Sequence, residues 1–180
     1  VGAPAFPAGH NGFAAWGITA GLADNTDLFI EEVGPDGASV RQGDRFVPCH
    51  VREETIRVKG APDVVERVIE TPRGPIVGSA LGQQSDVISL RATWLDPRPV
   101  RGLLRAHRAR SLEEFRRAFD QWPLMSLNVL YADTTGAIAW QLVGDVPHRR
   151  GGWGTLPRPG WLAESGWHDA PVPFERMPWL

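Results

Sequence analysis

The 180-residue sequence has 42% hydrophobic and 22% charged residues, values near the average for globular proteins. Its 19 basic and 21 acidic residues leave a formal net charge of −2, which excludes a chain-wide positive field for nucleic acid or an acidic membrane surface. The single cysteine, Cys49, excludes an intramolecular disulfide and a thiolate zinc cage. No window of about 18 apolar residues predicts a membrane span.

Most predicted elements are short strands, because 20 Gly and 16 Pro interrupt almost the whole chain. The first is a hairpin over residues 5–20, since Asn11-Gly12 lies between two apolar runs and suits a turn with positive φ. Further strands are predicted at 27–33, 45–51, 55–58, 64–71, 75–77, 87–94, 127–132 and 137–143. Asp133-Thr134-Thr135-Gly136 joins the last two and predicts a second hairpin.

Residues 97–122 form the one block with helical spacing. Ser111 and Glu114 fit a capping box, and the apolar residues that follow predict a helix over 112–121. Arg101, Arg105 and Arg108 recur at helical spacing and predict a shorter preceding helix with a basic face. After residue 147 no periodicity remains, so the last 34 residues are expected to wrap over a neighbouring surface. Residues 1–180 are expected to be a single piece without an internal boundary.

The sequence lacks the familiar nucleophile, phosphate-loop and dinucleotide motifs. Cys49 and His50 are adjacent, and neighbours on a strand point to opposite faces, so a buried structural cysteine is favoured over a catalytic dyad. Eight arginines between Arg91 and Arg117 could meet phosphate, but a solvated helix face is favoured, because no aromatic residues are interleaved with them and the whole chain is slightly acidic.

Asp24-Asn25-Thr26-Asp27 is the best metal candidate. Two carboxylates and an intervening carbonyl within four residues offer the hard oxygen ligands that Ca²⁺ prefers, although the pattern is not an EF-hand loop. The alternative is an Asx-type turn that leads into the following strand.

Several short motifs occur in a fixed order along the chain. The first are Gly9-His10-Asn11-Gly12, Ala15-Trp16-Gly17-Ile18-Thr19-Ala20 and Asp24-Asn25-Thr26-Asp27-Leu28-Phe29. Later ones are Arg52-Glu53-Glu54-Thr55-Ile56, Val58-Lys59-Gly60, Thr71-Pro72-Arg73-Gly74-Pro75, residues 128–133, Gly136, Leu156-Pro157-Arg158-Pro159-Gly160 and Pro173-Phe174-Glu175-Arg176-Met177-Pro178. Each is weak alone, but together they resemble the penicillin acylase family of N-terminal nucleophile amidases.

The resemblance implies an α+β fold, here a strand-rich piece of a four-layer αββα amidase. It also implies a precursor that cleaves itself and exposes a serine at the start of the large chain, with the serine's own α-amino group as the base. Val1 is not such a nucleophile. The chain therefore looks like an internal part of the large chain that lacks the nucleophile and a later oxyanion asparagine, and alone it is expected to be inactive.

Site residues carry over from the resemblance at matching positions. Ala20 matches a backbone N–H donor to the oxyanion, and Thr19 precedes it on the same strand. Ala8 and Ile18 match acyl-pocket positions where phenylacetyl-preferring members carry an aromatic and a small hydroxyl residue. These differences favour another acyl group, such as a longer aliphatic chain.

Further pocket positions match Leu127, Asn128 and, depending on the register, Thr93 or Trp94. Ordinary core packing is the alternative for Leu127 and Trp94. Arg73 stands where the family often has histidine, so no role is transferred to it. The family's structural Ca²⁺ would be held by the carboxylates of Asp24 and Asp27 and the backbone carbonyls of Thr26 and Gly154, and no organic cofactor is implied.

Two function classes therefore compete. The leading one is part of an acylase that hydrolyses a linear amide, and the other is a noncatalytic β-rich binding or structural module on the same scaffold. The expected partners are the remaining segments of the same precursor and a small acyl amide substrate, with no nucleic acid and no membrane. The family implies a periplasmic or secreted location.

Overall fold

The computed structural model describes residues 6–78, 86–96, 98–123 and 125–180. Val1 lies outside these ranges, and so does Ala5, the first residue of the predicted hairpin over 5–20. The chain divides into two compact units. The first unit comprises Val1–Asn25, Asp96–His148 and Asp169–Leu180, and the second comprises Thr26–Leu95 and Arg149–His168. Each is described by itself, and the single-piece organisation stays a prediction.

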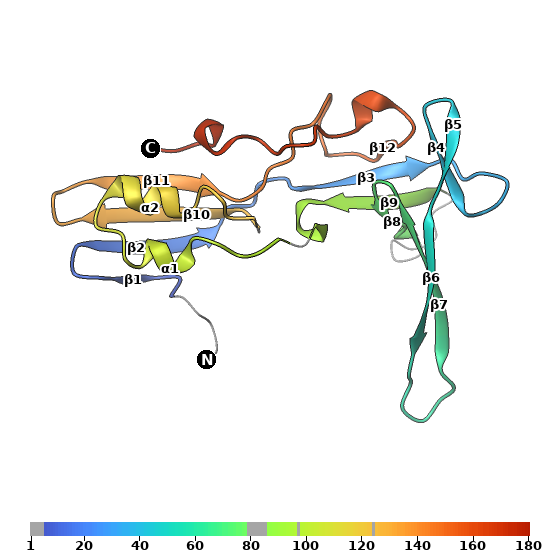
Figure 1. Cartoon of the computed structure of the whole chain (residues 1–180), viewed down its shortest axis with the longest axis horizontal. Helices are drawn as coiled ribbons and strands as arrows, with labels where there is room; N and C mark the ends of the chain where they lie inside the picture. Colours follow the sequence, from blue (N-terminus) through green and yellow to red (C-terminus); the bar gives the residue numbers. More distant parts are fainter. Residues whose placement is uncertain (1–5, 79–85, 97, 124) are drawn as a thin grey trace. The chain divides into compact units, whose positions relative to one another are not determined.

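The first unit is built on a four-stranded antiparallel sheet. Its order is β1 (Gly9–His10), β2 (Ala14–Ala20), β10 (Leu127–Asp133) and β11 (Ile138–Val143). Both predicted hairpins are confirmed, although β1 is only two residues long. The second hairpin docks β10 against β2, so residues far apart in sequence become neighbours in the sheet (Figure 1).

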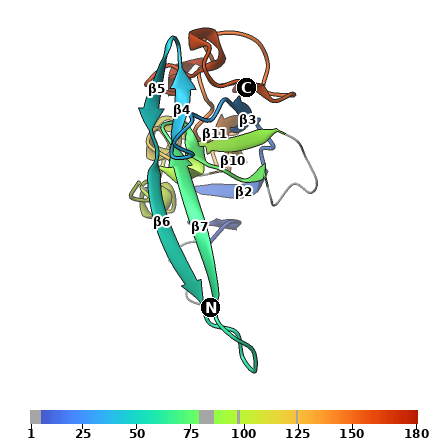
Figure 2. The same ribbon diagram turned by 90° about the vertical axis from the view of Figure 1, so that its right-hand side faces the viewer.

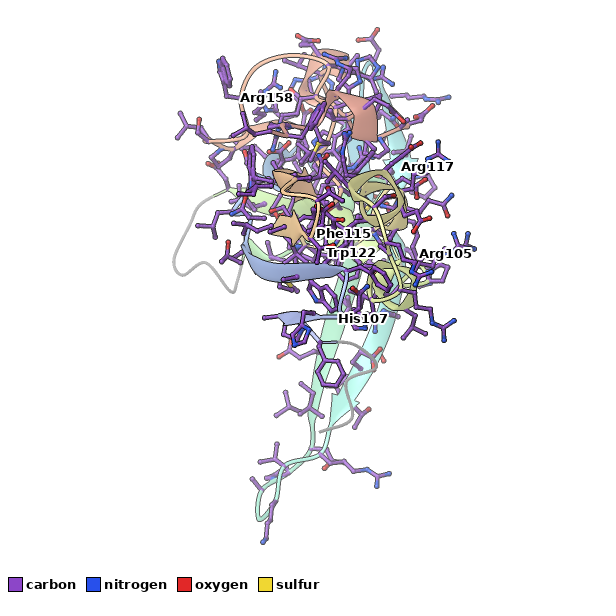
Figure 3. The ribbon with its side chains drawn as sticks, turned by 90° about the vertical axis from the view of Figure 1, so that its left-hand side faces the viewer. Arg105, His107, Phe115, Arg117, Trp122 and Arg158 are labelled. Carbon is purple, nitrogen blue, oxygen red and sulfur yellow. The ribbon has the colours of Figure 1, made fainter. Side chains whose placement is uncertain are left out.

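Two short helices cover one face of this sheet. They are α1 (Leu103–Ala106) and α2 (Leu112–Ala118). Phe115 of α2 lies 5.0 Å from the Tyr131 ring of β10, measured between centroids, and both side chains belong to the buried core. Phe115 and Trp122 turn toward the sheet while Arg105 and Arg117 turn away from it (Figure 3). Apolar residues at helical spacing therefore bind these helices to the strands, and Arg105 and Arg117 face outward.

The beginning of α2 follows the capping prediction. Ser111 Oγ accepts a hydrogen bond from the Glu114 N–H at 3.2 Å. The Glu114 carboxylate accepts from the Arg110 N–H rather than from the cap residue itself. The helix ends at Ala118, three residues before the predicted end, where Phe119 adopts a nonhelical conformation.

The C-terminal segment of the first unit covers the outer edge of β11. After the 3₁₀ helix η4 (Phe174–Arg176), the backbone of Leu180 exchanges two 2.9 Å hydrogen bonds with Trp140, and Leu142 N–H donates to Pro178 O. This agrees with the expected wrapping of the last residues over a neighbouring surface. It also pairs an edge that would otherwise expose unpaired backbone groups.

The second unit consists of three small sheets. The first has the order β12 (Arg158–Pro159), β3 (Thr26–Glu31) and β9 (Val87–Ala92), and the second pairs β4 (Ser39–Gln42) with β5 (Arg45–Pro48). The third has the order β6 (His50–Ile56), β7 (Val64–Thr71) and β8 (Gly74–Pro75). Short 3₁₀ helices occur at η2 (Thr93–Leu95) and η3 (Ala163–Ser165). β6 and β7 form a long two-stranded ribbon (Figure 2).

Two strand predictions in this unit need correction, and one strand was missed. The predicted strand 45–51 is two strands, because β5 pairs with β4 whereas β6 pairs with β7. The predicted strand 55–58 is only the end of β6. β4 was not predicted, and it turns into β5 through Gly43 at φ 61°. The strand-rich character is confirmed, while the four-layer arrangement stays a prediction. None of the helices in the described ranges is long and apolar enough to cross a membrane.

Candidate active site

β2 and β10 bring five of the predicted site residues together in the first unit. In the ladder Ala20 lies opposite Leu127, and Thr19 lies opposite Asn128. Ile18 precedes Thr19 on β2 and lies opposite Val129. Local sequence patterns do not reveal this pairing, because more than 100 residues separate the two strands.

Asn128 connects the two strands through its side-chain amide. Its Nδ2 donates to Thr19 Oγ1 at 3.2 Å and to the Ala20 carbonyl oxygen at 3.0 Å. Trp140 of β11 donates its Nε1–H to Asn128 Oδ1 at 3.0 Å. Both ends of the amide are therefore engaged, which fixes its orientation. Trp140 was missed in the sequence, since only the β10–β11 pairing places it beside Asn128.

The backbone N–H of Ala20 lies outside the β2–β10 ladder. Thr134 N–H donates to Phe13 O at one end of the ladder, and Gly21 N–H donates to Ser126 O at the other. Hydrogen-bonded and non-hydrogen-bonded pairs alternate in antiparallel sheets, so the Ala20–Leu127 pair falls between bonded pairs. The Ala20 N–H is thus not bonded to β10. An N–H that is to donate to a substrate oxygen must be left unpaired by the sheet in this way.

Gly21 allows the close approach of the chain beside this donor. A Cβ at this position would lie 2.8 Å from the Ser126 carbonyl carbon and 2.9 Å from the Leu127 nitrogen. The next residue, Leu22, has φ 52°, a left-handed conformation that is uncommon outside glycine. The sharp turn after β2 therefore requires glycine at residue 21.

The remaining pocket candidates of the first unit have different surroundings. Leu127 is 8% exposed and belongs to the hydrophobic core, and Ile18 packs against the same core. Both side chains therefore contribute to core packing. Ala8 is exposed and directly precedes β1. Their contribution to an acyl pocket stays a prediction.

The two other pocket candidates lie in η2 of the second unit. Thr93 is buried, and its Oγ1 has no hydrogen-bond partner among the described residues. Trp94 is half exposed, so it is not a core residue of the second unit. Which of the two meets a substrate stays a prediction.

The predicted metal ligands are divided between the units. Asp24 belongs to the first unit, whereas Thr26, Asp27 and Gly154 belong to the second. Gly154 lies in the turn before β12. The Asp27 carboxylate is buried, and both its oxygens accept hydrogen bonds from Arg149. Within the described ranges, no three His, Cys, Asp or Glu residues form a group that could hold a metal. The calcium site stays a prediction, although the donors around Asp27 do not fit it.

A second buried carboxylate, Glu31, was missed in the sequence. Its side chain is fully buried at the end of β3 and pairs with Arg73, whose Nε lies 2.8 Å from Oε1. Ser89 Oγ donates to the same oxygen at 2.5 Å, and Thr71 Oγ1 lies 3.4 Å from it. Arg73 therefore neutralises a buried charge, and this explains an arginine at that position.

The remaining reactive candidates have structural surroundings. Burial raises the pKa of the Cys49 thiol, and the negative charge of Glu31 raises it further. A raised pKa opposes the nucleophilic thiolate form. Asn11 serves its turn, because its Oδ1 accepts from Ala14 N–H at 2.9 Å and its Nδ2 donates to Ala109 O at 2.7 Å. His10 lies beside this turn in β1.

Comparison with known proteins identifies the scaffold. A family model described as penicillin amidase matches residues 1–180. This chain belongs to the penicillin amidase family. It is 34% identical over 173 residues to an acyl-homoserine lactone acylase of Pseudomonas fluorescens, covering 93% of this chain and 21% of that protein. It is 32% identical over 181 residues to penicillin G acylase of Escherichia coli, covering 97% of this chain and 21% of that protein.

The fold agrees with this membership. A thermostable penicillin G acylase from Alcaligenes faecalis superimposes with a TM-score of 0.78 at 23% identity, covering 99% of this chain and 32% of that one. The chain spans about a fifth of the length of the curated relatives it matches.

Proposed function

We propose that this chain forms part of an amidohydrolase that cleaves linear acyl amides into a carboxylic acid and an amine. The observation that carries the proposal is the Asn128 amide, which ties β2 to β10 directly beside the Ala20 N–H that β10 does not use. Membership in a family whose relatives are named acylases supports the same chemistry.

Three of the described residues have a part in the proposed reaction. A serine supplied by the rest of the protein attacks the amide carbonyl, and its own α-amine, with a pKa of about 7.7–8.0, takes the hydroxyl proton. Negative charge then develops on the carbonyl oxygen, and Ala20 N–H donates to that oxygen. Asn128 is a positioning residue, because it holds the Ala20 carbonyl and Thr19 in place.

For the substrate we propose an amide with an aliphatic acyl chain. Ala8 removes the bulk that an aromatic residue would occupy, and Ile18 adds apolar surface in place of a hydroxyl. One relative is named for acyl-homoserine lactones, which are acyl amides. Hydrolysis of acyl-homoserine lactones of increasing chain length, compared with a phenylacetyl amide, tests this preference. Clear preference for the phenylacetyl amide contradicts it.

The test of the catalytic proposal uses protein expressed from the complete reading frame. Intact-mass analysis should find two mature chains, the larger beginning with serine, and replacing that serine with alanine should leave one uncleaved chain. Asn128→Ala should lower kcat by about tenfold or more, since one donor-positioning contact is lost. Gln121→Ala, which removes an exposed amide of the same unit, should leave kcat unchanged.

The competing function is a noncatalytic module on the same scaffold. A single uncleaved chain without amide hydrolysis in the wild type supports that alternative. We also propose a periplasmic or secreted location, on the family resemblance. Cell fractionation that finds the mature protein in the cytoplasm contradicts it.

A further inference from the structure

Asp27 is a negative charge inside the second unit. Asp27, Phe29 and Glu31 alternate along β3 on its buried face, and the Asp27 side chain is only 4% exposed. A buried carboxylate is costly unless a cation or several hydrogen-bond donors compensate it. The identity of the compensating group decides whether this position needs a metal ion.

Arg149 supplies a positive charge in a two-pronged arrangement. Its Nη2 lies 2.9 Å from Asp27 Oδ1, and its Nε lies 2.9 Å from Oδ2. This fork-on-carboxylate geometry is the strongest form of the ion pair. Arg149 is itself largely buried, with 15% of its side chain exposed.

An indole completes the shell around the carboxylate. Trp167 donates its Nε1–H to Asp27 Oδ2 at 2.6 Å. The Arg91 guanidinium carbon lies 4.4 Å from the centroid of the Trp167 ring, so a second cation packs against the same indole. Both Asp27 oxygens thus face N–H donors.

These contacts oppose a calcium ion at the same carboxylate. Ca²⁺ needs six to eight oxygen ligands at about 2.3–2.6 Å, whereas the Asp27 oxygens are engaged by nitrogen donors. The fixed guanidinium charge beside the carboxylate would also repel a dication. We propose that the guanidinium of Arg149 takes the place of a metal ion at Asp27, so that this position is neutralised from within the chain. The proposal does not depend on amide hydrolysis.

The first test compares calcium content in the complete protein. Wild type and Asp27→Asn are equilibrated with Ca²⁺, freed of excess ion, and analysed for bound calcium per chain. We expect equal content, because any calcium held elsewhere is common to both. Loss of one calcium ion in Asp27→Asn overturns the proposal.

A second measurement decides the case even if Asp27→Asn fails to fold. Terbium bound at Asp27 would be excited through the Trp167 indole, whose nitrogen is 2.6 Å from the carboxylate. We expect the same indole-excited terbium emission from wild type and Trp167→Phe. Emission that disappears in Trp167→Phe overturns the proposal.

The pairing itself is tested by thermal unfolding of the complete protein. Arg149→Met should lower Tm by at least about 2 °C, because it leaves a buried carboxylate without its cation. Arg150→Met is the matched control, since Arg150 donates to the Trp167 carbonyl and not to a carboxylate. Asp27→Asn combined with Arg149→Met should cost less than the two single changes together. Additive losses overturn the pairing.

Discussion

Two carboxylates on the same face of β3 show how single residues organise the second unit. Asp27 and Glu31 are both buried, and each has its own arginine from a distant part of the chain. Such pairs add little net stability compared with apolar residues, but removing one partner leaves an uncompensated charge. The two arginines are therefore far less replaceable than the exposed arginines of α1 and α2.

Gly160 is required by the Glu31–Arg73 pair. A Cβ at residue 160 would lie 2.7 Å from Arg73 Nε and 2.8 Å from Glu31 Oε2. We expect Gly160→Ala to destabilise the protein by about 1–3 kcal/mol, because the ion pair must move to make room. A lower midpoint in thermal or urea unfolding measures the effect. Gly17→Ala, which would meet no atom within 4 Å, is the control and should cost clearly less.

Tyr131 should titrate at unusually alkaline pH. Burial raises its pKa to about 12, and the hydrogen bond to Asp133 adds to the shift. Between about pH 10 and 12 the unfolded chain loses this proton while the folded chain keeps it, so stability falls by about 1.4 kcal/mol per pH unit. The difference in absorbance titration between wild type and Tyr131→Phe isolates the group. A midpoint near 10 contradicts the prediction.

At the scale of elements, the sequence patterns correctly predicted the turns and helix caps that neighbouring residues determine. The Asn11-Gly12 turn and the Ser111 cap are set by neighbouring residues, and both occur where expected. β4 lacks such a signal, because it depends on its pairing with β5 and on the bridge between Val33 and Val40. The early end of α2 likewise depends on Phe119 turning into the core.

The candidate site likewise contains residues that the sequence could predict and residues that it could not. Thr19, Ala20 and Asn128 could be named because their motifs resemble a family, and the strand register then brought them together. Trp140 and Arg149 could not be found, because their roles depend on contacts with distant residues. Arg149 follows Asp27 by 122 positions, and nothing in the local sequence marks the pair.

The N-cap of α2 provides a prediction at the level of an element. Ser111→Ala removes the acceptor of the Glu114 N–H and should lower stability by about 1 kcal/mol. Ser111→Asp restores an acceptor and places a negative charge at the helix N-terminus, so it should retain stability. Unfolding curves of the two variants measure the difference. Equal losses in both would show that the cap does not stabilise α2.

At the scale of the whole molecule, the sheet of the first unit has one face packed by helices and one face on which the described residues place no helix. Leu130 and Ile138, on the latter face, are 48% and 81% exposed. The chain spans about a fifth of its curated relatives, so we propose that other segments of the same protein cover this apolar surface.

Expression of the 180-residue chain alone tests that proposal. We expect it to self-associate, because exposed apolar surface and strand edges favour association. Static light scattering measures the molar mass, and replacing Leu130 and Ile138 with lysine should shift it toward that of one chain. A stable monomer of the unmodified chain contradicts the prediction.

The pairing of β2 with β10 also has a consequence during synthesis on the ribosome. Asn128 emerges 109 residues after Thr19, its hydrogen-bond partner. At about 5–20 residues per second, β2 waits about 5–20 seconds for the strand that completes it. Throughout that interval the edge of β2 that later pairs with β10 has unpaired backbone N–H and C=O groups, which can bind any extended chain nearby. Holding factors that bind nascent chains should therefore matter most while residues 21–126 emerge from the ribosome.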